Sequence, residues 1–199
     1  MDILNRMTGT NKIFLLNPIG TIDENILKHL KEGIEDIFSF SEISVQISKS
    51  ILPLRKTEYN QTRGQYDGSK VIRRLLNQEY KKDVFRVLGI MDEDLYSGNL
   101  NFIFGLATTS KSAPNELYVA ALISIIRLRE AFYGNAENQE LFKERALKEA
   151  IHELGHTFGL GHCNNNCIMR FSNHLGQTDD KPLEFCDWCM IKLRNYFGP

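Results

Sequence analysis

The segment from Asn135 to about Phe158 constrains the fold of this chain more than any other part of the sequence. It contains no proline and no glycine before Gly155, and good helix formers dominate it. Its apolar residues recur at i, i+4, i+7 and i+11, which places them on one stripe of a helix; they are Leu147, Ile151, Leu154 and Phe158. The pattern predicts one long helix with its apolar stripe against a core, and with His152 and His156 on the side that faces a cleft.

Upstream of this helix, strand-like and helix-like segments alternate along the chain. Strands are expected over residues 13–16, 43–47, 84–90, 102–104 and 118–126. Helices are expected over 26–38 and 71–76, and a short C-terminal helix is expected near 185–196. A polar loop from about residue 55 to 68 precedes the second helix, with Asp67 or Ser69 as its cap. The order indicates an α+β fold, α/β-like in its N-terminal half, in which helices flank a sheet.

Composition excludes several classes of protein. The chain has 199 residues with 24 Lys and Arg against 25 Asp and Glu, so its formal net charge is −1 and a basic nucleic-acid-binding surface is not expected. The longest apolar stretch, residues 118–126, is too short to cross a bilayer, and the N-terminus shows no export signal. We therefore expect one domain over residues 1–199, a cytoplasmic monomer with neither a nucleic-acid nor a membrane partner.

A metal-ligand pattern lies at the end of the expected long helix. His152 and His156 are one helical turn apart, so both imidazole rings can reach one ion. Gly159 can adopt a left-handed conformation that ends the helix and brings His162 to the same ion. Three protein ligands leave one position of a zinc ion for water, which is typical of a catalytic site. Glu153, about 100° further around the helix, is suited to act as general base on that water and then to return the proton.

The four cysteines all lie near the C-terminus, in two close pairs. They are Cys163, Cys167, Cys186 and Cys189. Four thiolates can form a closed tetrahedral shell around a structural zinc ion. Two disulfides, or reduced thiols without a metal, are the alternatives. With a metal at the cysteines, the chain would bind two zinc ions, one catalytic and one structural.

The extended pattern from His152 to His162 resembles that of the metzincin zinc peptidases. The cysteine directly after the third histidine, the Cys167-Ile-Met169 segment and the later Cys-x-x-Cys are similar to those of the archaemetzincins. The resemblance implies a metzincin-type zincin with a mixed sheet, a long active-site helix and a small C-terminal subdomain. Residues 1–161 would then form the upper subdomain and residues 162–199 the zinc-stabilised C-terminal subdomain. Cys163, Cys167, Cys186 and Cys189 would bind the structural zinc, and Met169 would form the Met-turn beneath the catalytic metal.

The same resemblance implies a zinc-dependent metallopeptidase of peptide or protein substrates, with aminopeptidase-like activity. Two other functions stay open: an inert zinc-binding interaction or structural module, and a zinc hydrolase of a non-peptide amide or ester. The intact Glu153 favours an enzyme over an inert module.

Peptidases commonly bind an extended substrate as an added strand of a sheet. Residues 117–128 suit such an exposed edge strand, but their apolar run suits a buried central strand equally well. Arg127 or Arg129 would be placed to contact a peptide terminus, which would favour exopeptidase action.

Overall fold

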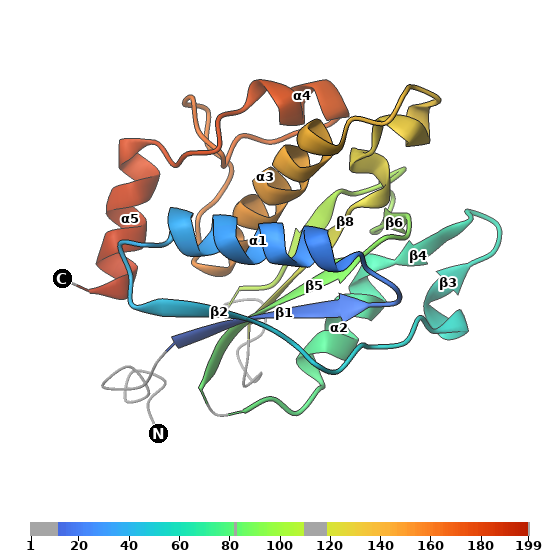
Figure 1. Ribbon diagram of the computed structural model, residues 1–199, viewed down its shortest axis with the longest axis horizontal. Coiled ribbons are helices and arrows are strands. Elements are labelled where there is room, and N and C mark those ends of the chain that lie inside the picture. The colour runs from blue at the N-terminus through green and yellow to red at the C-terminus, as the bar shows by residue number, and fades with distance from the viewer. Residues whose placement is uncertain (1–11, 82, 110–118, 199) are drawn as a thin grey trace.

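Figure 1 shows the computed structural model, which describes residues 12–81, 83–109 and 119–198. At its centre lies a five-stranded sheet in the order β2-β1-β5-β8-β7. The strands are β1 (Lys12–Ile19), β2 (Ile43–Ile47), β5 (Val84–Met91), β7 (Gly105–Ala107) and β8 (Val119–Ser124). The first four strands in this order are parallel, and β7 pairs antiparallel with β8. The expectation of an α+β fold with a mixed sheet is therefore confirmed.

Helices cover both faces of this sheet (Figure 1). On β8, Ala121 and Ile123 pack into the core shared with α1 (Glu24–Ile37) and α3 (Gln139–Thr157). The alternate residues, Ala120 and Leu122, pack into the core beneath α2 (Gly68–Leu76). Because successive side chains of a strand point to opposite faces, a strand covered on both faces is apolar throughout. This explains the continuous apolar run in the sequence of β8.

A second, smaller sheet was not predicted from the sequence, and two of its three strands lie in the segment expected to be a polar loop. It contains β3 (Tyr59–Asn60), β4 (Gln65–Asp67) and β6 (Leu95–Tyr96), and a short 3-10 helix, η2 (Lys56–Glu58), precedes it. The side chain of Asp67 accepts hydrogen bonds from the backbone N–H groups of Ser69, at 3.0 Å, and Lys70, at 3.4 Å. Asp67 is thus the N-cap of α2.

The expected strand over residues 102–104 is wrong. Ile103 forms only an isolated bridge with Leu95, and β7 begins at Gly105. The rings of Phe102 and Phe104 contact each other edge to face, with centroids 5.2 Å apart. The apolar signal of this segment therefore arises from side-chain packing and not from strand pairing.

Other elements also differ from expectation. β8 ends at Ser124 because the chain then enters two 3-10 helices, η3 (Ile126–Leu128) and η4 (Glu130–Tyr133), and Tyr118 lies outside the described residues. The helix α3 begins at Gln139 rather than Asn135, because the Asn138 side chain accepts a hydrogen bond from the Leu141 N–H at 3.1 Å and caps the helix there. A short helix that the sequence did not indicate, α4 (Leu175–Asp180), precedes α5 (Asp187–Phe197).

The C-terminal segment packs into the same core as the rest of the chain. Ile168, Met169 and Leu193 are fully buried there together with residues of α1 and α3. The division into subdomains at residues 161 and 162 stays an interpretation of the sequence. No helix among the described residues combines the length and the apolar character needed to cross a bilayer.

We expect Leu30→Ala to lower the free energy of unfolding by about 2–5 kcal/mol, because the side chain is fully buried and its removal leaves a cavity. Urea unfolding followed by circular dichroism measures this change. Lys28→Ala on the exposed side of the same helix is the matched control, and its effect should stay within about 0.5 kcal/mol. Equal losses in the two variants would contradict the packing of α1 described here.

Candidate metal centres

The end of α3 reverses the chain as the sequence predicted. Gly159 has a φ of +82° and lies just beyond the helix. Its N–H donates to the carbonyl of His156 at 2.9 Å, and the N–H of Leu160 donates to the carbonyl of Gly155 at 3.3 Å. These two bonds form a Schellman motif, which satisfies the last carbonyl groups of the helix. The reversal brings His162 back beside the two helical histidines.

The three histidine side chains converge, and backbone carbonyls orient two of them. The Nδ1 atom of His152 lies 2.9 Å from the carbonyl of Ile168, and that of His156 lies 2.8 Å from the carbonyl of Leu160. A carbonyl oxygen can only accept, so both Nδ1 atoms carry the proton and both Nε2 atoms of the neutral rings carry a lone pair. The two Nε2 atoms nevertheless lie 3.0 Å apart. With a ring nitrogen of His162, they form a group of three nitrogens that lie within 4.8 Å of one another and could hold a metal ion.

Electrostatics keeps these rings in the form that binds a metal. Burial, assisted by the positive charge of Lys181, lowers the pKa of His152 to about 2. Burial also lowers the pKa values of His156 and His162. All three rings are therefore neutral at pH 7, and two lone pairs that face each other at 3.0 Å repel unless a cation lies between them. Three neutral imidazole nitrogens fit a zinc ion.

Glu153 lies in the same cleft as the histidines. The cleft has a volume of about 710 Å³ and is lined by the three rings, Glu153 and Glu149, among other residues. Glu153 is only 5% exposed, and within the described residues its Oε2 atom is buried without a hydrogen-bond partner. Burial, with the negative charge of Glu149, raises the pKa of Glu153 well above its usual range. A carboxyl group with an unpaired oxygen beside the three histidines suits proton transfer.

Met169 lies against the ligand-bearing part of α3. Its side chain is fully buried, and its sulfur meets α3 at Gly155, between the two helical histidines, where a Cβ atom would collide with it. The carbonyl of Met169 accepts a hydrogen bond from the N–H of Cys163 at 2.9 Å. This turn also contains Ile168, whose carbonyl orients His152. The turn that contains Met169 thus packs against the part of α3 that carries His152 and His156.

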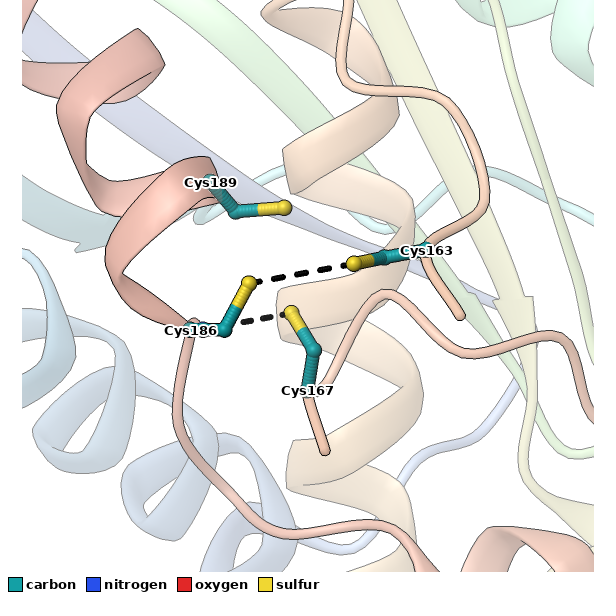
Figure 2. Close-up of side chains that lie close together, drawn as sticks. All are labelled: Cys163, Cys167, Cys186 and Cys189. Atoms are coloured by element: carbon teal, nitrogen blue, oxygen red, sulfur yellow. Dashed lines mark hydrogen bonds between the residues drawn. The ribbon is translucent and has the colours of Figure 1, made fainter. Parts of the chain in front are cut away.

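The four cysteine sulfurs point toward one another (Figure 2). They come from three segments: Cys163 after α3, Cys167 beside Met169, and Cys186 and Cys189 at the start of α5. All four lie within 4.8 Å of one another, the Sγ atoms of Cys163 and Cys186 are 3.7 Å apart, and none is in a disulfide. The structure therefore contradicts the alternative of two disulfides.

Hydrogen bonds favour a thiolate at one of these cysteines. The amide of Asn165 donates to the sulfur of Cys186 at 3.6 Å. Although burial acts to raise it, hydrogen bonds from the backbone of Cys189 and from Asn165 lower the pKa of Cys186 to about 6. A thiolate is the form that binds a metal, and four sulfurs in a closed group fit a tetrahedral zinc ion.

A buried ion pair beside the cleft, between Lys181 and Glu149, was not predicted from the sequence. The ammonium group of Lys181 lies 2.8 Å from Oε1 of Glu149, and the hydroxyl of Thr178 donates to the same oxygen at 3.2 Å. Both charged side chains are at least 95% buried. Helical spacing could have indicated Glu149, because it lies one turn before Glu153 on the same side of α3. No local signal marks Lys181, which is 32 residues away.

Residues 117–128 were expected to form either an exposed edge strand or a buried central strand. Within the described residues, β8 lies between β5 and β7 and is buried throughout, so the alternative of a central strand is confirmed. The strand β7 forms the edge and lines the cleft. Arg127 binds Asp94 through two hydrogen bonds of 2.6 Å, and Arg129 binds Asp92 at 2.8 Å. Neither arginine lines the cleft, which removes the support for exopeptidase action from these residues.

Comparison with known proteins identifies the family. A model of peptidase family M54 matches residues 11–195. This chain belongs to that family. The archaemetzincin of Methanocaldococcus jannaschii is 40% identical over 182 residues, which cover 90% of this chain and 92% of that protein. The archaemetzincin of Pyrococcus furiosus is 39% identical over 191 residues, which cover 94% of each chain.

Solved structures of M54 relatives have the same fold. The archaemetzincin of Methanopyrus kandleri matches with a TM-score of 0.78 at 32% identity, over 95% of this chain and 97% of that one. The archaemetzincin of Archaeoglobus fulgidus, crystallised with malonate, matches with a TM-score of 0.74 at 30% identity, over 90% and 99%. The chain is therefore a zinc metallopeptidase that hydrolyses peptide bonds of peptide or protein substrates, with a metzincin-type fold.

We expect Lys181→Met to lower the free energy of unfolding by about 3–5 kcal/mol, because it leaves the buried Glu149 carboxylate without its partner. Guanidinium unfolding of the M54 chain measures the loss. Lys49→Met, at an exposed position, provides the control and should change stability by less than about 0.5 kcal/mol. A Lys181→Met protein as stable as the wild type would show that the pair adds nothing to the fold.

Proposed function

We propose that His152, His156 and His162 bind the catalytic zinc of this peptidase and that Glu153 is its general base. The observation that carries the proposal is the contact of two unprotonated Nε2 atoms at 3.0 Å, both oriented by backbone carbonyls. The buried Oε2 atom of Glu153, unpartnered within the described residues, supports its part in the reaction. Met169 would support the site from below α3, as a Met-turn.

When bound, zinc supplies Lewis acidity, which polarises the scissile carbonyl and lowers the pKa of water at the site. Glu153 takes the proton from the attacking water and passes it to the nitrogen of the leaving amine. The Glu153 side chain is itself buried, which strengthens its electrostatic interactions with neighbouring groups. His152 and His156 need little rearrangement for this, because the protein already holds their tautomers.

The substrate would bind along β7 as an added antiparallel strand. The support is that β7 ends the sheet, pairs on one side with β8 and lines the cleft. An aminopeptidase-like preference, as the family resemblance implies, would require the chain to be held by its N-terminus. The carboxylate of Glu149 lies in the cleft wall, but Lys181 already pairs with it, so the described residues favour no terminus.

A second zinc ion at Cys163, Cys167, Cys186 and Cys189 completes the proposal. The support is the closed group of four unpaired sulfurs. Unpaired thiols suit a reducing compartment, which favours a cytoplasmic protein. A monomer without a nucleic-acid partner is the assembly that we propose, in keeping with the net charge of −1.

Membership of the M54 family argues against the two other functions that the sequence left open. An inert zinc-binding module would have no use for a buried, unpaired carboxylate in the cleft, so Glu153 favours the enzyme. A zinc hydrolase of non-peptide amides would use the same residues. Assays with peptide libraries and with non-peptide amides and esters distinguish a peptidase from a hydrolase of non-peptide substrates.

We expect Glu153→Gln to lower kcat by about 10²–10⁴-fold, because the amide has the shape of the carboxyl group but cannot accept the proton. Zinc content and melting temperature should stay at wild-type values. Glu140→Gln on the same helix, where the side chain is 87% exposed, serves as the control and should retain full activity. Peptide hydrolysis at saturating substrate is the measurement, and an active Glu153→Gln enzyme would remove Glu153 from the mechanism.

We expect elemental analysis to find two zinc ions per wild-type chain. The double variant His152→Ala/His156→Ala should retain one zinc ion, with its melting temperature nearly unchanged. Cys186→Ser should also lose one zinc ion, but with a lower melting temperature, because a structural metal contributes folding free energy. Wild-type stoichiometry in both variants would show that the ligands have been assigned wrongly.

A further inference from the structure

The backbone of β7 and the side chain of Glu153 lie very close together at Gly105, which has no side chain. A Cβ atom built on Gly105 would lie 2.5 Å from Cγ, 2.6 Å from Oε1 and 2.7 Å from Cδ of Glu153. These are its three nearest neighbours. The missing side chain of Gly105 thus leaves the space that the carboxyl group of Glu153 occupies.

The backbone conformation at position 105 does not require a glycine. Gly105 is absent from the residues with positive φ, and it pairs with Ile123 of β8 in an ordinary antiparallel register. An alanine can adopt this backbone without strain. The three atoms that such a Cβ atom would meet first all belong to the Glu153 side chain.

We propose that Gly105 is a positioning residue for Glu153 in the peptidase reaction. The proposal rests on the general-base role of Glu153 proposed above. Contact between Gly105 and the carboxyl group limits where that group can lie, and the same strand lines the cleft in which the substrate binds. A Cβ atom at position 105 would move the end of a flexible side chain and would leave the sheet in place, so the base would be displaced while the fold is kept.

The substitution Gly105→Ala tests this directly. We expect kcat to fall on the order of 10²-fold, the size expected for a catalytic group displaced by about 1 Å, while KM and zinc content change little. A crystal structure of the variant should show the Glu153 carboxyl group moved away from β7. A rise of KM with kcat unchanged would mean that Gly105 serves substrate docking and would overturn the proposal.

A second readout does not depend on activity or on the metal. In metal-free protein, Gly105→Ala should lower the melting temperature when residue 153 is Glu, but not in the background of Glu153→Ala, which lacks the three colliding atoms. Equal shifts in the two backgrounds would show that the Cβ atom collides with something else. Gly176→Ala is the matched control, because a Cβ atom there meets only the ring of His174, at 3.4 Å or more.

These measurements distinguish failure of the two proposals. If Glu153→Gln is inactive and Gly105→Ala is fully active, the general base stands and the positioning role of Gly105 is wrong. If Glu153→Gln retains wild-type activity, the general base is wrong, and the positioning role that rests on it is wrong as well.

Discussion

The burial of α3 on nearly every side is the constraint on which the rest of the structure depends. A buried helix cannot leave its charged side chains to water, and three buried ones on α3 have partners elsewhere in the chain: Arg145, Lys148 and Glu149. The segment around the end of α4 provides several. Asp179 binds Arg145 through two hydrogen bonds of 2.6 and 2.7 Å, its carbonyl accepts from Lys148 at 2.9 Å, and Lys181 pairs with Glu149. These contacts hold α3, which carries the candidate site, against the segment at the end of α4.

The same constraint prepares the histidines. Carbonyl groups from two turns, at Ile168 and Leu160, place the protons of the helical histidines on Nδ1 and leave the Nε2 atoms that face each other without a proton. Burial removes the competing positively charged form. Ligand orientation and protonation are both settled by the apoprotein, so binding of a metal requires little reorganisation.

Features that depend on local periodicity could be predicted from the sequence, and features that depend on distant pairing could not. The strand over residues 43–47 and the reversal at Gly159 follow from alternation and from the conformational freedom of glycine. The three-residue strand β7 has no periodic signal of its own, and it exists because β8 is there to pair with it. The six-residue helix α4 has one large apolar side chain, Leu175, and therefore no apolar stripe.

The candidate sites also contain some features that local spacing predicts and others that depend on contacts between distant residues. The helical histidines and Glu153 share one turn, so their spacing carries the information, as it does for the two cysteine pairs. The partnership of Glu149 with Lys181, and the approach of Gly105 to Glu153, join residues far apart in the sequence. No pattern within a short window can encode such contacts.

One more consequence follows from the fact that the last histidine of one cluster and the first cysteine of the other are consecutive residues. A single peptide unit, about 3.8 Å between Cα atoms, separates His162 from Cys163, so the chain has no slack there to absorb movement. A displacement of the Cys163 backbone therefore also moves the backbone of His162, so the position of the sulfur group is tied to that of the histidine group.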